Sequence, residues 1–128
     1  MGKFTEVEDS IFAIFAGEEW DAEGIPTFPN NYNPTSNLEE FIRVDVIPSG
    51  MGININSLSG LIIIEIFTPA GKGPRRATEI ADILDKYFAG KSSASTQFMQ
   101  SNFRSVGNET AYYHCSYSIQ FNFYKSFN

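Results

Sequence analysis

The stretch GLIIIEIFTPAGKGPRRATEIADILDKYF, residues 60–88, carries the strongest structural signals in the chain. Its first part is apolar on both faces apart from Glu65, which predicts a strand at the centre of a sheet or covered on both sides. Pro74 follows a glycine and suits the first turn of a helix. Residues 77–88 then place their apolar side chains on one wide helical stripe, and Gly90 ends it. The stretch therefore predicts a strand, a short connection and an amphipathic helix.

Weaker patterns on either side predict the other elements. Residues 4–15 place apolar side chains on one helical face. Residues 17–40 are rich in Gly, Pro and Asn and predict a long, ordered surface loop that its aromatic residues anchor. Residues 41–50 alternate as a half-buried strand. Residues 95–106 and 110–127 predict two more strands, the second with one buried side.

The expected order is helix, strand, strand, helix, strand, strand. This order predicts an α+β fold, with two helices packed on a mixed or mostly antiparallel sheet of about four to five strands. The weak alternation in residues 48–58 predicts a protruding hairpin arm. At 128 residues, the chain 1–128 is expected to be a single domain.

Composition restricts the function classes. The net charge of −6 and the absence of a basic patch argue against a nucleic-acid or membrane-surface binder. A single cysteine cannot form an internal disulfide. The longest apolar run, Leu61–Ile64, is too short to span a bilayer. We expect a soluble protein that is made in a cytoplasm and uses no cofactor. The aromatic content of 15% exceeds what a small monomer easily buries, which favours a subunit interface.

The loop at 71–76 invites comparison with phosphate-binding loops. A Walker A loop has Ser or Thr after its lysine, whereas Gly73 follows Lys72 here, and Pro74 lacks an N–H. Helix N-termini do bind anions, and Lys72, Arg75 and Arg76 would assist. We prefer a strand-to-helix turn with an exposed basic rim. A small phosphate- or nucleotide-binding enzyme remains the alternative from another class.

Other residues that could carry chemistry give no enzyme signature. His114 and Cys115 are adjacent on a strand, so their side chains point to opposite faces, with Cys115 on the buried one. One His and one Cys cannot build a zinc site. Glu65, on a nearly apolar strand, must be paired or lie at an interface, and Arg43 is the expected partner. Asp82 and Lys86 are spaced to pair along a helix. These residues predict an assembly or binding protein, not an enzyme, with no metal site.

Two segments carry a family resemblance. FIRVDVIPSG, followed by GLIIIEIFTPAGKGPRRATEIADILDKYF, resembles the tail terminator (tail completion) proteins of long-tailed bacteriophages. The matching positions are Arg43, Val44, Val46, Phe67, Pro69, Gly71, Gly73, Ala77, Ala81, Asp82, Leu84 and Phe88. Ile80 stands where that family has Leu. The resemblance covers about two thirds of the chain and is weakest in residues 17–40 and after residue 105.

The resemblance implies a structural virion protein in the neck region of the tail. A homo-hexameric ring would cap the tail tube, end its polymerisation and present a surface to the head-completion or connector protein. DNA would pass through the lumen without specific binding, and no membrane would be involved. Another neck, connector or tail-tube subunit is the alternative within the same class.

The resemblance also directs attention to possible contacts between subunits. The arm at 48–58 is the natural segment to reach a neighbour, through Met51, Ile53, Ile55 and Leu58. The basic residues Lys72, Arg75 and Arg76 are expected at contacts within or between rings, where acids such as Glu18 and Glu19 would pair with them. Arg43 and Glu65 complete the expected interface set.

Overall fold

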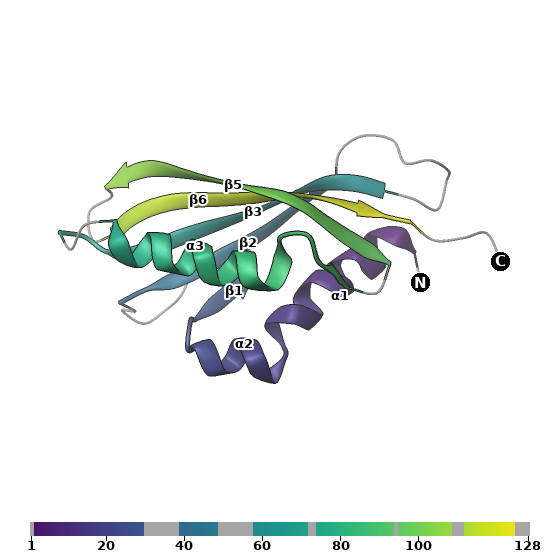
Figure 1. Cartoon of the computed structure of the whole chain (residues 1–128), viewed down its shortest axis with the longest axis horizontal. Coiled ribbons are helices and arrows are strands. Elements are labelled where there is room, and N and C mark those ends of the chain that lie inside the picture. Colours follow the sequence, from purple (N-terminus) through teal and green to yellow (C-terminus); the bar gives the residue numbers. More distant parts are fainter. Residues whose placement is uncertain are drawn as a thin grey trace.

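The structure is a computed structural model, and it describes residues 2–29, 39–48, 58–71, 74–93, 95–108 and 112–124. Within these ranges the chain forms three helices and one sheet of six strands (Figure 1). In chain order the elements are α1 (Lys3–Phe15), α2 (Glu18–Glu23), β1 (Thr27–Pro29), β2 (Phe41–Pro48), β3 (Leu58–Pro69), α3 (Arg75–Phe88), β4 (Ser92–Ser93), β5 (Thr96–Asn108) and β6 (Tyr112–Phe123).

The sheet has the strand order β1-β2-β3-β6-β5-β4. Only β1 and β2 run parallel, and the other neighbours are antiparallel. The predicted α+β class is therefore correct, but the expected strand count, helix count and order were wrong. The segment 17–40, predicted as a loop, contains α2 and β1, and residues 92–93, just before the predicted strand 95–106, form β4. These elements span six, three and two residues, too few for a periodic pattern to reveal them.

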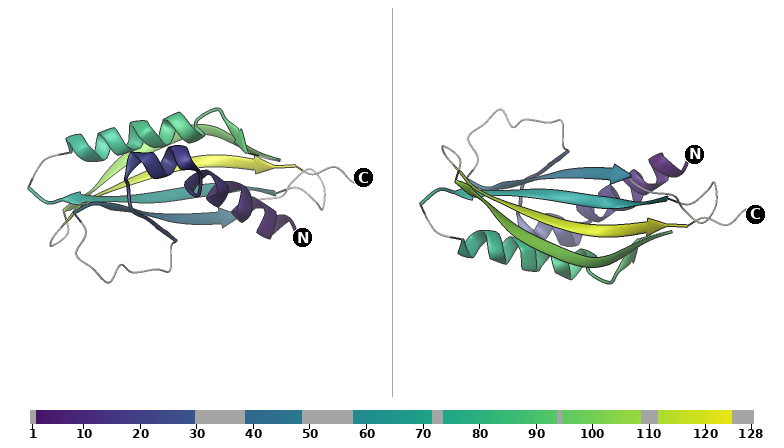
Figure 2. Two further views of the ribbon diagram at one scale, coloured as in Figure 1. Left: turned by 90° about the horizontal axis from the view of Figure 1, so that it is seen from below. Right: turned by 90° about the horizontal axis from the view of Figure 1, so that it is seen from above.

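The described helices cover one face of the sheet and none of them lies on the other, as both views of Figure 2 show. We call these the helix face and the open face. Isoleucines at alternate positions of β3 point to the helix face and are fully buried, as are Tyr117 and Phe121 of β6. The largest buried side chains are Tyr117, Phe88, Phe121, Ile11, Ile42, Ile62, Ile64, Ile66, Ile80, Leu84, Ile119 and Val7. The main core therefore lies between α1, α3 and the helix face.

The short helix α2 is attached to α3 by one aromatic and one ionic contact. Trp20 is 3% exposed, and its indole packs edge-on against Tyr87 with ring centroids 5.3 Å apart. Glu23 accepts hydrogen bonds from Lys86 Nζ and Tyr87 Oη, both at 2.8 Å. Lys86 is thus paired with α2, and the expected pair with Asp82 was wrong. The bond from Lys86, then that from Tyr87, lowers the pKa of Glu23.

Gly60 allows three strands to approach closely. A Cβ atom built on this residue would lie 2.4 Å from the carbonyl oxygen of Ile47 and 2.8 Å from the ring of Phe121. The residue is buried between β2 and β6, its neighbours in the sheet. The Phe121 ring therefore packs over the glycine and occupies the space that a side chain would need.

We predict that Gly60→Ala lowers the free energy of unfolding by about 1–3 kcal/mol, because the added methyl group must displace a backbone carbonyl and a packed ring. Denaturant titration measures the change. Gln120→Ala, at an exposed position of β6, is the control and should change stability by less than about 0.5 kcal/mol. Equal stability of the two variants would contradict the close approach at Gly60.

We also predict that Glu23→Gln lowers the melting temperature near neutral pH, and that its difference from the wild type shrinks in acid. The pKa of Glu23 is lowered below its ordinary value of 4.5, so its contribution is present above pH 4.5 and is lost as the pH falls through the folded-state value. Thermal melts from neutral pH to pH 3 measure it. Asp82→Asn, on the exposed side of α3, is the control and should leave the melting temperature at neutral pH nearly unchanged. A pH-independent difference for Glu23→Gln would refute the pairing with α3.

Candidate functional site

The loop that follows β3 offers less free positive charge than the sequence predicted. Lys72 and Gly73 lie outside the described residues. Arg76 donates to both carboxylate oxygens of Glu40, at 2.9 and 2.8 Å, and also lies 3.6 Å from Glu79. The bond with Glu40 raises the pKa of Arg76. Arg75 pairs with Glu79 at 3.5 Å and is otherwise exposed. The guanidinium of Arg76 is therefore already engaged by carboxylates of its own chain.

His114 and Cys115 point to opposite faces of β6, as predicted. Cys115 is fully buried in the core, and burial raises the pKa of its thiol, which disfavours the reactive thiolate. His114 was expected on a polar face, yet it is only 8% exposed. It stacks on Phe67 with ring centroids 4.4 Å apart and an angle of 12° between the rings. The apolar ring of Phe67 thus gives the open face a small core of its own.

An ion pair lies at the centre of this second core. Arg43 Nε and Nη2 donate to Glu65 Oε2 at 3.1 and 2.8 Å, and both side chains are about one quarter exposed. The guanidinium also lies over the ring of Phe67, 5.2 Å from its centroid. Nε2 of His114 is 3.4 Å from Glu65 Oε1. The expected contact between Arg43 and Glu65 is confirmed, because β2 and β3 pair these two residues directly.

Aromatic rings surround this pair and bury its apolar side. Phe41 stacks on Phe67 with centroids 4.7 Å apart, and Tyr112 lies edge-on to both. Phe28 from β1 packs against Phe41 at 6.0 Å. We call Phe28, Phe41, Phe67, Tyr112 and His114 the aromatic cluster. It joins β1, β2, β3 and β6 at one end of the sheet, so its role in this chain is structural.

Beyond the aromatic cluster, the open face carries little net charge, and its apolar side chains include Ile47, Leu61 and Ile63. In the four long strands its described charges are Arg43, Glu65, Asp45 and Arg104, two of each sign. Outside the aromatic cluster, its other polar side chains on these strands include the hydroxyls and amides of Ser59, Gln97, Asn102, Ser116, Ser118, Gln120 and Asn122. A face of this composition suits contact with a polar surface without tight electrostatic binding.

The expected interface residues are distributed over several parts of the molecule. Met51, Ile53 and Ile55, with most of the expected arm, lie outside the described residues. Leu58 begins β3 and is 6% exposed, buried in the core of its own chain. Arg43 and Glu65 lie on the open face, whereas Arg75 and Arg76 begin α3, which packs on the helix face. The described members of the set form no single cluster.

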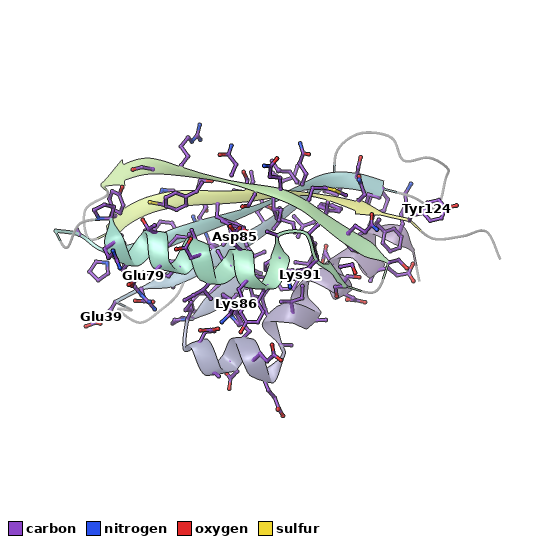
Figure 3. All side chains as sticks on the ribbon, in the orientation of Figure 1. Glu39, Glu79, Asp85, Lys86, Lys91 and Tyr124 are labelled. Carbon is purple, nitrogen blue, oxygen red and sulfur yellow. The ribbon has the colours of Figure 1, made fainter. Side chains whose placement is uncertain are left out.

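No enclosed catalytic centre emerges from the described part of the chain. No group of three or more His, Cys, Asp or Glu side chains there is arranged to hold a metal ion. One groove, of about 610 Å³, runs between α1, α2, α3 and β4, and its charged lining is Glu18, Glu19, Lys86 and Lys91. Lys86 already pairs with Glu23 and, in Figure 3, lies on the side of α3 toward α2. None of the helices in the described ranges has the length and apolar character of a membrane span.

Sequence reasoning missed the strand edges, where exposed apolar side chains occur. Phe103 and Val106 on β5 are 39% and 53% exposed, and Ile47 on β2 is 38% exposed. Their positions became visible only with the strand order, which places β5 and β2 toward opposite sides of the sheet. The charges Arg104 on β5 and Asp45 on β2 were a signal that the sequence did contain.

Comparison with known proteins identifies the fold alone. No protein-family model and no curated protein matches the chain. A solved structure superposes on it with a TM-score of 0.70 at 18% sequence identity, covering 94% of this chain and 98% of the other. The arrangement of helices on one face of a mixed sheet therefore occurs in another protein of similar length.

We predict that Glu65→Gln lowers the free energy of unfolding by about 1–2 kcal/mol, because it leaves the half-buried Arg43 without a full countercharge. Urea titration measures the change. Glu79→Gln removes a more exposed carboxylate with two arginine partners and should cost less than about 1 kcal/mol. If Glu65→Gln costs no more than Glu79→Gln, the pair does not hold β2 to β3.

Proposed function

We propose that this chain is a ring-forming structural protein of a long-tailed bacteriophage, of the tail terminator type. Six copies would cap the tail tube, end its polymerisation and present a surface to the head-completion protein. The observation that carries the proposal is the sheet, which within the described residues has an open face and, toward both sides, long strands that are only partly paired. Unpaired strand edges attract further strands, so a protein that keeps them has a use for association.

The charges of the open face support a role beside DNA. The chain carries a net charge of −6, yet the described charges of that face cancel. Duplex DNA binds proteins chiefly through its phosphates, and binding increases with each cation that faces them. A lumen lined by the open face would hold the duplex by neither strong attraction nor strong repulsion. DNA would then pass without specific binding.

The phosphate-binding alternative has less support from the described residues. Arg76 is held by Glu40 and Glu79, so a phosphate would have to displace two carboxylates to reach it. Another neck, connector or tail-tube subunit remains compatible with the same surfaces, since each of these also associates into rings. The position of the protein along the virion is therefore part of the proposal that needs a direct test.

We predict that the purified protein assembles to about six times its monomer mass of 14.3 kDa, alone or when tail-tube tips are added. Native mass spectrometry and light scattering across concentrations measure the mass. The added tube tips should also stop elongating when the protein is present. A monomer that ignores tube tips, and whose melting temperature rises with a nucleotide, would overturn the proposal in favour of the loop at 71–76.

A further inference from the structure

The outer edge of β5 is paired over only part of its length. β4 pairs with Thr96 and Gln97, and two backbone bonds from the preceding turn reach Phe98 and Met99. From residue 100 to residue 108, no other described strand lies on this edge. An extended, unpaired strand edge is a ready template for another strand.

The outer edge of β2 is incomplete as well, at the other end of the strand. β1 pairs with Ile42, Arg43 and Val44 only. Within the described ranges, Asp45–Pro48 has no strand on its outer side. The free part of β2 begins with an acidic residue, whereas the free part of β5 contains a basic one, Arg104. Neither Asp45 nor Arg104 forms an ion pair with a described residue.

The strand directions allow these two edges to meet. Four strands, β2, β3, β6 and β5, run antiparallel in succession, so β5 points opposite to β2. If a second copy is placed beside β5 in the same orientation, its β2 is antiparallel to β5. We propose, building on the proposed ring assembly, that copies of this chain join head to tail by adding β5 of one copy to β2 of the next. The partner is thus a second copy of the same chain.

Side-chain faces and charges select one register for this contact. Arg104 and Asp45 both lie on the open face. Setting them opposite each other also sets Phe103 opposite Val46 on the helix face. Residues 101–104 then meet residues 45–48, and all eight positions lie on the free edges. The contact joins a charge pair on one face to an apolar pair on the other.

Neighbouring registers are less favourable. A shift by one residue would place side chains on the wrong faces. If the two copies were not shifted along the strands, Arg104 would face Arg43 of the next copy, which makes a like-charge pair. That part of β2 is also already paired with β1. In the chosen register, the residue after Arg104 would face Val44 of the next copy. The outer edge of Val44 is already paired with Pro29 of β1, so β5 must turn away after Arg104. The register irregularity between Ser105 and Gly107 is where β5 can bend away.

Cysteine cross-linking tests the contact directly. The variant Asp45→Cys with Arg104→Cys cannot form a disulfide within one chain, because β3 and β6 separate the two positions by three strand spacings of about 4.8 Å each. Under oxidation it should yield covalent oligomers larger than a dimer, up to the ring. Each single variant can yield only dimers. The matched control is Asp82→Cys with Arg104→Cys, which uses an exposed position on α3. It should not form the ladder of covalent oligomers larger than a dimer.

Charge reversal gives an independent measurement in the full chain. Arg104→Asp and Asp45→Arg should each weaken self-association by about tenfold, because each replaces an opposite-charge pair with a like-charge one. The double variant should regain most of the wild-type association. Lys91→Asp makes the same change of net charge as Arg104→Asp at another exposed position and should have little effect. Thermal melts of the free protein identify any variant that is merely unfolded.

The outcomes separate the contact from the ring. A ladder together with rescue by the double variant supports the contact between β5 and β2. A ring of the expected mass without a ladder, and without a response to charge reversal, overturns this contact and leaves the ring assembly standing. Absence of any oligomer, with and without tube tips, overturns both.

Discussion

The position of β3 at the centre of the sheet is the constraint on which the rest of the structure depends. β3 pairs with β2 from Gly60 to Phe67 and with β6 along its whole length. A strand that is bonded on both sides and apolar on both faces needs cover above and below. The amphipathic helix α3, which follows it directly, covers the helix face. The aromatic cluster covers one end of the open face.

The alternation of β3 side chains between the two faces of the sheet explains why a charge is tolerated on this strand. Glu65 points to the open face, directly opposite Arg43, and the two stay about one quarter exposed. Phe67 lies two residues further along the same face and packs against both the guanidinium and His114. Burial of the aromatic rings and pairing of the charges thus support each other at this end of the sheet. A half-buried charge at Glu65 without its partner Arg43 would destabilise the strand.

Ion pairs and buried hydrogen bonds in the described residues mainly connect the elements of the fold. Several described ion pairs connect different parts of the fold, such as Arg76 with Glu40 and Glu23 with Lys86. Tyr117 donates to Asp85 at 2.6 Å from within the core, and burial raises the pKa of its hydroxyl. By contrast, within the described ranges the long strands β2 and β5 have partly unpaired edges that carry exposed apolar side chains and charges without an ion pair. These are the features through which strands of separate copies can join.

The sequence by itself determined the elements that are long and periodic. It located α1, β2, β3, α3, β5 and β6, the opposite faces of His114 and Cys115, and the pairing of Arg43 with Glu65. Such features follow from the periods of helices and strands, which a single chain segment already expresses. The tertiary structure alone decided the short elements α2, β1 and β4, the burial of His114, the pairing of Lys86 with Glu23, and the free edges. Each of these depends on which strand or helix lies next to which, and that is set by packing between segments far apart in the chain.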